Sequence, residues 1–356
     1  MSLDPRLKKA IESIPVADLP LNLGDVAKIS SAEDGGIDVE TGLALGRIAD
    51  GLADAVRGVL AEHDNSSAVE ISHRIRSHGV QRNLSPLEGV SNIIAVASGK
   101  GGVGKSTTAV NLALALADDG ARVGVLDADI YGPSQPLMLG LSGESPVSED
   151  GKTMNPLVAH DLQVMSIGFL VDQDQPMVWR GPMVTSALNQ LLKQTNWDKL
   201  DYLIVDMPPG TGDIALTLSQ QVPVSGAVIV TTPQDIALLD ARKGLQMFKK
   251  VSVPVLGVIE NMSTHICSNC GHEEAIFGHG GGATMAADFE LPLLGSLPLD
   301  AQIRAQTDSG NPTVAQSPDS PQAEAYRHAA RMMAATLAQQ GRDYSRHFGA
   351  IKVENS

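Results

Sequence analysis

The stretch GKGGVGKST, residues 99–107, constrains the fold more strongly than composition does. It lies between the apolar run NIIAVAS and the Ala- and Leu-rich run TAVNLALALADDG, which indicates the order strand, glycine-rich loop, helix. The spacing Gly99-x4-Gly104-Lys105-Ser106 is that of a phosphate-binding loop in its required context. Glycines let backbone N–H groups turn toward phosphate oxygens, and the helix N-terminus adds partial positive charge. The stretch therefore predicts a nucleotide-binding α/β domain.

Within this loop the pattern assigns separate roles to the side chains. Lys105 is expected to reach the β- and γ-phosphates of ATP, and the Ser106 hydroxyl is expected to bind Mg²⁺. Thr107 is placed to hydrogen-bond a phosphate. The predicted nucleotide-binding residues of the loop are Gly99, Lys100, Gly101, Gly102, Val103, Gly104, Lys105, Ser106 and Thr107.

Two acidic segments follow later strands and complete the predicted ATP site. VLDADIYGPSQP ends a strand with Asp127 and Asp129, and YLIVDMPPGTGD ends a longer apolar strand with Asp206. A carboxylate after such a strand orients the attacking water or contacts Mg²⁺. A single aspartate at a strand end would more often be a turn or cap residue. Three loops in the right order favour catalysis instead, with Asp206 holding Mg²⁺ through water.

The spacing of the apolar residues divides the rest of the chain into segments. From residue 92 to 341 short strands alternate with helices, and runs such as AVIVTT are continuously apolar, which predicts a mostly parallel central sheet flanked by helices. Residues 1–76 predict a small α+β domain with a helix, a hairpin, a second helix and a third strand. Residues 77–91 are expected to be a linker, and 342–356 a tail without clear pattern.

Charge and hydropathy exclude several classes of function. The formal net charge of −15 disfavours binding to nucleic acid and to anionic membranes. No apolar run approaches the roughly 18 residues of a membrane helix, and the N-terminus lacks the apolar core of a signal peptide. We therefore expect a cytoplasmic protein.

The only two cysteines, Cys267 and Cys270, stand together in HICSNCGH. An iron–sulfur cluster normally takes four thiolates, so one chain supplies half of a site. A two-fold dimer would bring two such pairs together. The main alternative is zinc held within one chain by both cysteines with His265 and His272. A redox-active dithiol and a purely structural loop are further alternatives.

Several motifs in one order give a specific resemblance over about residues 91–340. ASGKGGVGKST, DADIYGPSQP, MVWRGPMV, DYLIVDMPPGTGD, VIVTTPQDIALLDARKG, GVIENMS, the CxxC and IFGHGGG together resemble the Mrp/ApbC-type iron–sulfur cluster carriers. This family lies within the MinD/ParA superclass of P-loop ATPases with a deviant Walker A loop. The resemblance implies a protein that binds an iron–sulfur cluster, hydrolyses ATP and delivers the cluster to apo-proteins.

The resemblance also implies roles for individual residues. Lys100 would cross a dimer interface to the nucleotide of the other subunit, and Asp129 would position water while Asp127 is structural. Asn261 would hydrogen-bond adenine, with residues 297–300 flanking the base. The implied catalytic residues are Lys100, Lys105, Asp129 and Asp206, and the implied metal ligands are Cys267 and Cys270 for the cluster and Ser106 and Asp206 for magnesium.

This chain departs from the family pattern in two places. Family members often have proline after the first cysteine, where this chain has Ser268, which alters the stiffness of the loop and leaves the ligand count unchanged. The unit at 1–76 is loosely similar to a small iron–sulfur-assembly domain but contains no cysteine.

From the motifs and the cysteine count together, we expect a homodimer that uses ATP and Mg²⁺ and bridges one [4Fe–4S] cluster. Its expected partners are apo iron–sulfur proteins and cluster-assembly scaffolds.

Rival functions share the nucleotide loops. A DNA-partitioning ATPase would need a basic face, and a membrane-cycling ATPase would need a basic amphipathic C-terminal helix, which RDYSRHFGAIKVENS does not supply. A nitrogenase-type reductase places its cluster cysteines far apart rather than as CxxC. A scaffold that uses ATP only as a conformational switch is the remaining alternative.

Overall fold

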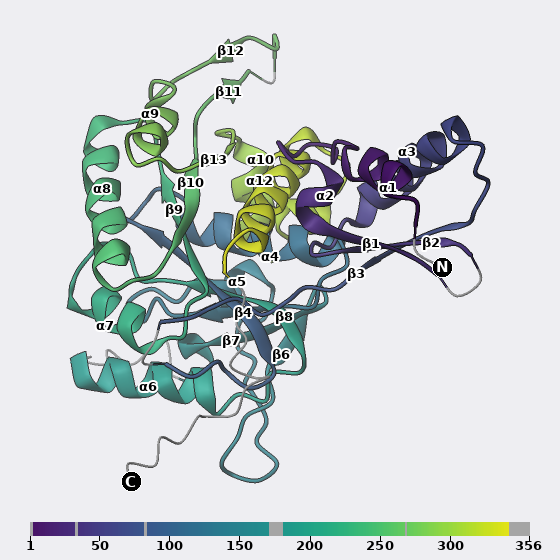
Figure 1. The fold of residues 1–356 in the computed structure, drawn as a ribbon. Helices are drawn as coiled ribbons and strands as arrows, with labels where there is room; N and C mark the ends of the chain where they lie inside the picture. The colour runs from purple at the N-terminus through teal and green to yellow at the C-terminus, as the bar shows by residue number, and fades with distance from the viewer. Residues whose placement is uncertain (1–2, 33–34, 82–83, 171–180, 268, 342–356) are drawn as a thin grey trace, which may run out of the picture.

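The computed structural model describes residues 3–32, 35–81, 84–170, 181–267 and 269–341 (Figure 1). Its body is built on an eight-stranded sheet with the order β13-β10-β9-β4-β8-β5-β7-β6. Neighbouring strands are parallel except β6 and β7, which form an antiparallel pair at one edge. The strands are β4 (Val90–Ser98), β5 (Val123–Asp127), β6 (Leu157–Ala159), β7 (Leu162–Ser166), β8 (Leu200–Asp206), β9 (Gly226–Thr231), β10 (Val255–Glu260) and β13 (Leu293–Ser296).

Helices cover this sheet, as the sequence predicts. Apolar side chains of the central strands, such as Ile94, Val205 and Val228, are completely buried because helices pack on the sheet from both sides (Figure 1). Helices α4 and α12 pack against each other, and α8 packs against β9. The helices of the body are α4 (Lys105–Asp118), α5 (Gln135–Met138), α6 (Gly181–Lys193), α7 (Asp213–Gln221), α8 (Asp235–Lys250), α9 (Gly281–Asp288), α10 (Ala301–Asp308), α11 (Thr313–Gln316) and α12 (Pro321–Ala338), with the short 3-10 turn η2 (Ile167–Phe169).

The N-terminal unit contains a second, three-stranded sheet with the order β1-β2-β3. Strands β1 and β2 form the predicted antiparallel hairpin, and β3 is the predicted third strand, parallel to β2. Val39 and Val56 are fully buried where helix α3 covers one face of this sheet. The elements are α1 (Pro5–Glu12), α2 (Leu23–Val26), β1 (Ala27–Ser31), β2 (Ile37–Thr41), η1 (Gly46–Ile48), α3 (Ala49–Glu62) and β3 (Val69–His73).

The N-terminal unit contacts the body at the C-terminal end of α4, the helix that begins at the phosphate loop. Arg47 pairs with Asp118 at 3.0 Å, and the Gly46 N–H donates to the Asp119 carbonyl at 3.0 Å. A Cβ on Gly46 would lie 2.5 Å from the Asp119 Cα, so only glycine permits this approach. Arg331 of α12 holds the buried Asp119 carboxylate with two bonds of 2.8 Å.

A small hairpin carries the cysteine segment. Strands β11 (His265–Ile266) and β12 (Glu273–Glu274) pair antiparallel and project beyond the body (Figure 1). In the ranges that the structure describes, no helix is long and apolar enough to cross a membrane. The predicted tail at 342–356 and residues 82–83 of the predicted linker lie outside those ranges.

Candidate functional site

The sheet order brings the three predicted ATP-site segments together. Strand β4 lies beside β8, and β8 lies beside β5, so the loops that follow these parallel strands emerge next to one another. The carboxyl edge of a parallel sheet is where ligands of such folds bind. The segments concerned are the phosphate loop, the turn that begins at Asp127 and the turn that begins at Asp206.

Glycine is required at both ends of the phosphate loop. Gly104 adopts a left-handed φ of 80°, and a Cβ there would lie 2.2 Å from the Asn261 amide nitrogen. A Cβ on Gly99 would lie 2.1 Å from the Asp240 carbonyl carbon of α8. The loop is therefore packed tightly at its ends, whereas Gly101 is exposed and has open space around it.

Lys105 lies inside a cluster of acidic side chains. It is only 6 % exposed, and its ammonium group forms an ion pair with the fully buried Asp206. The same nitrogen lies 3.1 Å from the Ser106 hydroxyl and 4.0 Å from an oxygen of Asp129. The ammonium group neutralises carboxylates that would otherwise be buried without a counter-charge.

Asp127 and Asp129 occupy different environments although only one residue separates them. Asp127 is fully buried and accepts hydrogen bonds from the Asp129 N–H, the Gln135 N–H and the Ser166 hydroxyl, each at 3.1 Å. Burial, with the nearby charge of Asp206, raises the pKa of Asp127 to about 7. Its surroundings fit the structural role that the resemblance implies.

Asp129 faces a solvent-accessible space. It lines a cavity of about 420 Å³ together with Tyr131, residues 208–209 and 212 of the turn after β8, and residues 213–215 at the start of α7. Partial burial raises the pKa of Asp129, while the Lys105 ammonium opposes that rise. This cavity gives water access to the carboxylate, and the water-positioning role remains a prediction.

Gln135 joins the site although the sequence analysis assigned it no role. Its Nε2 donates to Asp206 at 2.9 Å and to the Ser106 carbonyl at 3.2 Å. The buried Oε1 atom has no hydrogen-bond partner within the described structure. The only sequence signal was a polar residue in the first turn after DADIYGPS, which is ordinary at the start of a helix.

The oxygen atoms gathered here fit a magnesium ion. The Ser106 hydroxyl and the Asp206 carboxylate both contact the Lys105 ammonium group, so they lie within a few ångströms of one cation position. Hydroxyl, carboxylate and amide oxygens are the ligands that Mg²⁺ prefers, and Gln135 presents an unpartnered amide oxygen beside them. This donor set suits the predicted magnesium ligands Ser106 and Asp206.

Two further residues of the predicted nucleotide site are Asn261, which lies against the loop, and Lys100, which is part of it. The buried Asn261 follows β10 and donates from Nδ2 to the Val103 carbonyl at 2.8 Å, so one of its amide hydrogens supports the loop. Lys100 is half-buried, and its carbonyl accepts the Ser98 hydroxyl at 2.9 Å. The predicted contacts of Asn261 with adenine and of Lys100 with a second subunit remain predictions.

The cysteine loop differs in character from the ATP site. Cys267 is half-buried, Cys270 is exposed and both thiols are free. The Cys267 N–H donates to the His272 carbonyl at 2.9 Å, and the Gly271 N–H donates to the Cys267 carbonyl at 2.8 Å. The backbone N–H of Asn269, followed by that of Cys270, lowers the pKa of the Cys267 thiol. A thiolate is the form that binds iron or zinc.

The histidines of this segment, His265 and His272, flank the two cysteines in the sequence. His265 points a ring nitrogen toward the Leu299 carbonyl at 3.0 Å. Among the described residues, no three His, Cys, Asp or Glu side chains are grouped to hold a metal ion. The zinc site within one chain remains an alternative to a cluster bridged between two chains.

A family model described as ParA: NUBPL iron-transfer P-loop NTPase matches residues 89–334. The chain belongs to this family. The resemblance to cluster carriers of the MinD/ParA superclass is thereby confirmed, as is the P-loop NTPase fold.

Members of this NUBPL-type family resemble the chain over most of its length. This chain is 60% identical over 267 residues to an iron-sulfur cluster carrier protein of Pseudomonas fragi, and the match covers 75% of this chain and 93% of that protein. It is 54% identical over 259 residues to the mouse iron-sulfur cluster transfer protein NUBPL, covering 72% and 81%.

Solved structures agree with the fold. A nucleotide-binding protein from Archaeoglobus fulgidus in complex with ADP is 35% identical with a TM-score of 0.59, covering 67% of this chain and 92% of that one. The cell division ATPase MinD of Pyrococcus furiosus is 26% identical with a TM-score of 0.51, covering 68% and 98%.

Proposed function

We propose that this protein is an ATP-hydrolysing carrier that binds an iron–sulfur cluster between the two copies of a homodimer and transfers it to apo-proteins. One observation carries the proposal: the chain combines a phosphate loop with a single pair of free cysteines on a projecting hairpin. The family description names iron transfer, and the relatives in Pseudomonas fragi and mouse are named for cluster carriage and transfer. We expect the carrier to work in the cytoplasm with cluster-assembly scaffolds as donors.

The ATP half of the proposal follows from the buried loop. The phosphates of ATP bind to the backbone N–H groups at the start of α4, and Lys105 exchanges its pairing with Asp206 for the β- and γ-phosphates. A magnesium ion held by Ser106 and Asp206 would neutralise phosphate charge there. Breaking the Lys105–Asp206 pair on binding would let the acidic residues sense whether nucleotide is present.

Hydrolysis then needs an oriented water molecule. The Asp129 carboxylate, which lies at the edge of the cavity, accepts a hydrogen bond from water and directs the water oxygen at the γ-phosphorus. The new P–O bond forms as the bond to the bridging β–γ oxygen breaks, ADP leaves, and the proton of the water passes to the released phosphate. Lys100 of a second copy would add positive charge at this point.

The cluster half follows from counting ligands. Each chain supplies the Cys267 and Cys270 thiolates, so two chains supply the four that a [4Fe–4S] cluster takes. A two-fold axis beside the hairpin would place both pairs on one cluster. Because the hairpin projects beyond the body, the cluster would remain accessible to a recipient protein (Figure 1).

Anaerobic reconstitution with iron and sulfide tests this proposal. We expect about four iron atoms per dimer, absorbance and EPR spectra of a [4Fe–4S] cluster, and transfer to an apo-acceptor that changes with ATP. About four iron atoms per monomer would contradict the bridging site. Purified protein that retains zinc after reconstitution, with no iron uptake, would favour the zinc alternative instead.

A further inference from the structure

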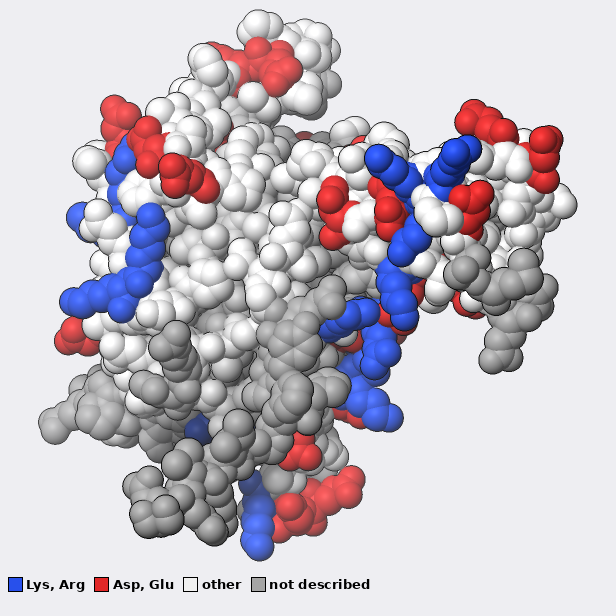
Figure 2. Space-filling model, in the orientation of Figure 1, with Lys and Arg blue, Asp and Glu red and all other residues white. Residues whose placement is uncertain are grey.

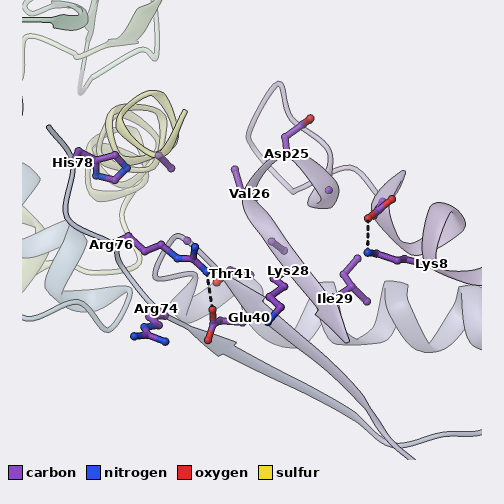
Figure 3. Close-up of a pocket in the computed structure, with 15 residues that line it drawn as sticks. Lys8, Asp25, Val26, Lys28, Ile29, Glu40, Thr41, Arg74, Arg76 and His78 are labelled. Carbon is purple, nitrogen blue, oxygen red and sulfur yellow. Dashed lines mark hydrogen bonds and ion pairs between the residues drawn. The ribbon is translucent and has the colours of Figure 1, made fainter. Parts of the chain in front are cut away.

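A second pocket lies where the N-terminal unit meets the body. Its volume is about 300 Å³, and it is lined by side chains of α1, β1 and β2, by the segment 74–78 that leads from β3 to β4, and by Ala338 of α12 (Figure 3). Charged and polar residues dominate this lining. We call it the junction pocket; its charged residues are Lys8, Glu12, Asp25, Lys28, Glu40, Arg74 and Arg76.

Acidic neighbours neutralise only some of the four cations in the junction pocket. Lys8 lies 3.7 Å from Glu12 within α1, and Arg76 lies 3.1 Å from Glu40 of β2. Asp25 is engaged by the backbone N–H that precedes α2, at 2.9 Å.

Two cations in the pocket keep no counter-ion. Lys28 and Arg74 are exposed, and within the described part of the chain neither forms an ion pair. They lie on either side of Glu40, whose carboxylate Arg76 already holds (Figure 3). The pocket therefore presents two positive charges that are free to bind an anion.

The strand register sets the spacing between these two charges. Lys28 stands opposite Glu40 in the β1–β2 pair, and Arg74 directly follows β3, the strand on the other side of β2. Glu40 in turn stands opposite Ser72 of β3, so Arg74 lies two residues further along, and two strand spacings with this offset separate the two backbones by about 12 Å. Two carboxylates carried on one extended segment match that separation better than one small anion does.

One wall of the pocket is fixed by the body of the protein. Asn92, at the start of β4, donates from its side-chain amide to the Arg76 carbonyl at 2.9 Å. Its amide oxygen accepts the His78 N–H at 3.0 Å. These bonds hold the backbone that carries Arg76, so this side of the pocket needs little ordering when a ligand binds.

The charge of the pocket stands out against that of the whole chain. The protein has a net charge of −15, yet Figure 2 shows Lys and Arg side chains gathered along the join between the N-terminal unit and the body, with Asp and Glu side chains among them. Cations without an ion-pair partner on an otherwise acidic protein attract an anionic segment to this place while the remaining surface repels it, which favours one binding orientation.

We propose that the junction pocket binds an acidic segment of a partner protein, with Lys28 and Arg74 each pairing with one carboxylate. This inference rests on the proposed carrier function, because a carrier needs a docking surface for the proteins that give or receive the cluster. It assigns that surface to the N-terminal unit. Docking there leaves the cysteine hairpin free for the cluster.

A fluorescein-labelled hexaglutamate peptide tests the proposal through fluorescence anisotropy with full-length protein that carries neither cluster nor nucleotide. We expect saturable binding that weakens as salt rises. The double variant Lys28→Gln/Arg74→Gln should bind about 10-fold more weakly or worse, because two charge-assisted hydrogen bonds are lost. The control Lys152→Gln/Lys193→Gln removes the same charge at exposed sites elsewhere and should stay within about 2-fold of the wild type.

Three results would overturn the proposal. These are equal weakening in the control variant, unchanged binding in the pocket variant, and inorganic phosphate that displaces the peptide with equal or higher affinity. Lys28→Arg/Arg74→Lys retains both charges and should bind the peptide, which separates lost charge from lost folding. Iron loading of the pocket variant measures the carrier function separately from peptide binding. The failure of one proposal can therefore be distinguished from the failure of the other.

Discussion

At the phosphate loop, Lys105 is buried against Asp206, and Gln135 and Asn261 add hydrogen bonds to the loop and its neighbours. At the cysteine hairpin, Cys270 is exposed, and the described contacts of Cys267 lie within the hairpin itself, with backbone groups and with the Cys270 side chain. Both segments are short motifs that can be recognised in the sequence. Of the two, the phosphate loop is the one whose described side-chain contacts come from several distant parts of the chain.

This difference indicates how each site is completed. A phosphate group needs donors at fixed positions, and a packed loop supplies them without a large cost of ordering. A cluster that is delivered to another protein must instead be reachable, and under our proposal a hairpin that supplies two thiolates takes its remaining ligands from a second copy. The first site is preorganised, whereas we propose that assembly of a dimer completes the second.

Replacing Lys105 with alanine tests the preorganised half and has the largest expected effect. It removes the cation that binds the phosphates, and ATP turnover should fall by about 10³-fold or more. It also leaves the buried Asp206 without its partner, so the free energy of unfolding should fall by about 3–5 kcal/mol. Steady-state phosphate release and urea unfolding measure the two effects.

The exposed Lys152 provides the matched control for this experiment. Lys152→Ala should leave both turnover and stability close to those of the wild type. If Lys105→Ala retained full turnover, the phosphate loop would not be the catalytic site. Iron loading of Lys105→Ala after reconstitution should persist, provided that its unfolding transition remains cooperative.

Replacing Cys267 with alanine tests the other half. Because it removes two of four thiolates from the dimer, iron bound after reconstitution should drop about 10-fold or more. ATP turnover should stay within about 2-fold, because the hairpin makes none of the described contacts of Lys105 or Asp206. A collapse of ATP turnover with normal iron loading would reverse this division of labour.

The last prediction concerns pH and Asp127. Its pKa is raised to about 7 in the folded protein, above its ordinary value of 3.8, so the folded state holds the proton more tightly. The corresponding stability is fully present below about pH 4 and is lost as pH rises toward 7, by up to about 1.4 kcal/mol per pH unit. The side chain of the Asp127→Asn variant does not ionise, so this variant lacks the pH-dependent contribution.

Urea unfolding between about pH 5 and pH 7 measures this contribution. The stability of the wild type relative to Asp127→Asn should fall as pH rises through that window. A difference that is independent of pH would mean that Asp127 is already ionised in the folded protein. Such a result would replace our assignment of a protonated, structural carboxyl group.

The sequence predicted the backbone of the ATP site well because that backbone is specified locally. The backbone at position 104 has a positive φ, which favours glycine, and the strand, loop and helix are formed by consecutive residues. Alternating strands and helices likewise predicted the mostly parallel sheet. The cysteine spacing indicated a metal site from equally local information, since both cysteines lie within four consecutive residues, and that site remains a prediction.

The side-chain partners could not be predicted in this way. Lys105 and Asp206 are 101 residues apart, Gln135 and Asp206 are 71 apart, and Asn261 and Val103 are 158 apart. Their contacts depend on which strands become neighbours in the sheet. Asn261 illustrates the limit, since the sequence did not predict its contact with the loop backbone, while its contact with adenine remains a prediction.

The sequence by itself determined the phosphate loop, the fold class and the supply of two thiolates per chain, because each depends on residues close together in the chain. The tertiary structure decided that Gln135 joins the acidic cluster and that Asp127 is buried while Asp129 faces a cavity. It also decided that Lys28 and Arg74 share one pocket. Strand order and burial set these charges and contacts, and both arise only when distant segments pack together.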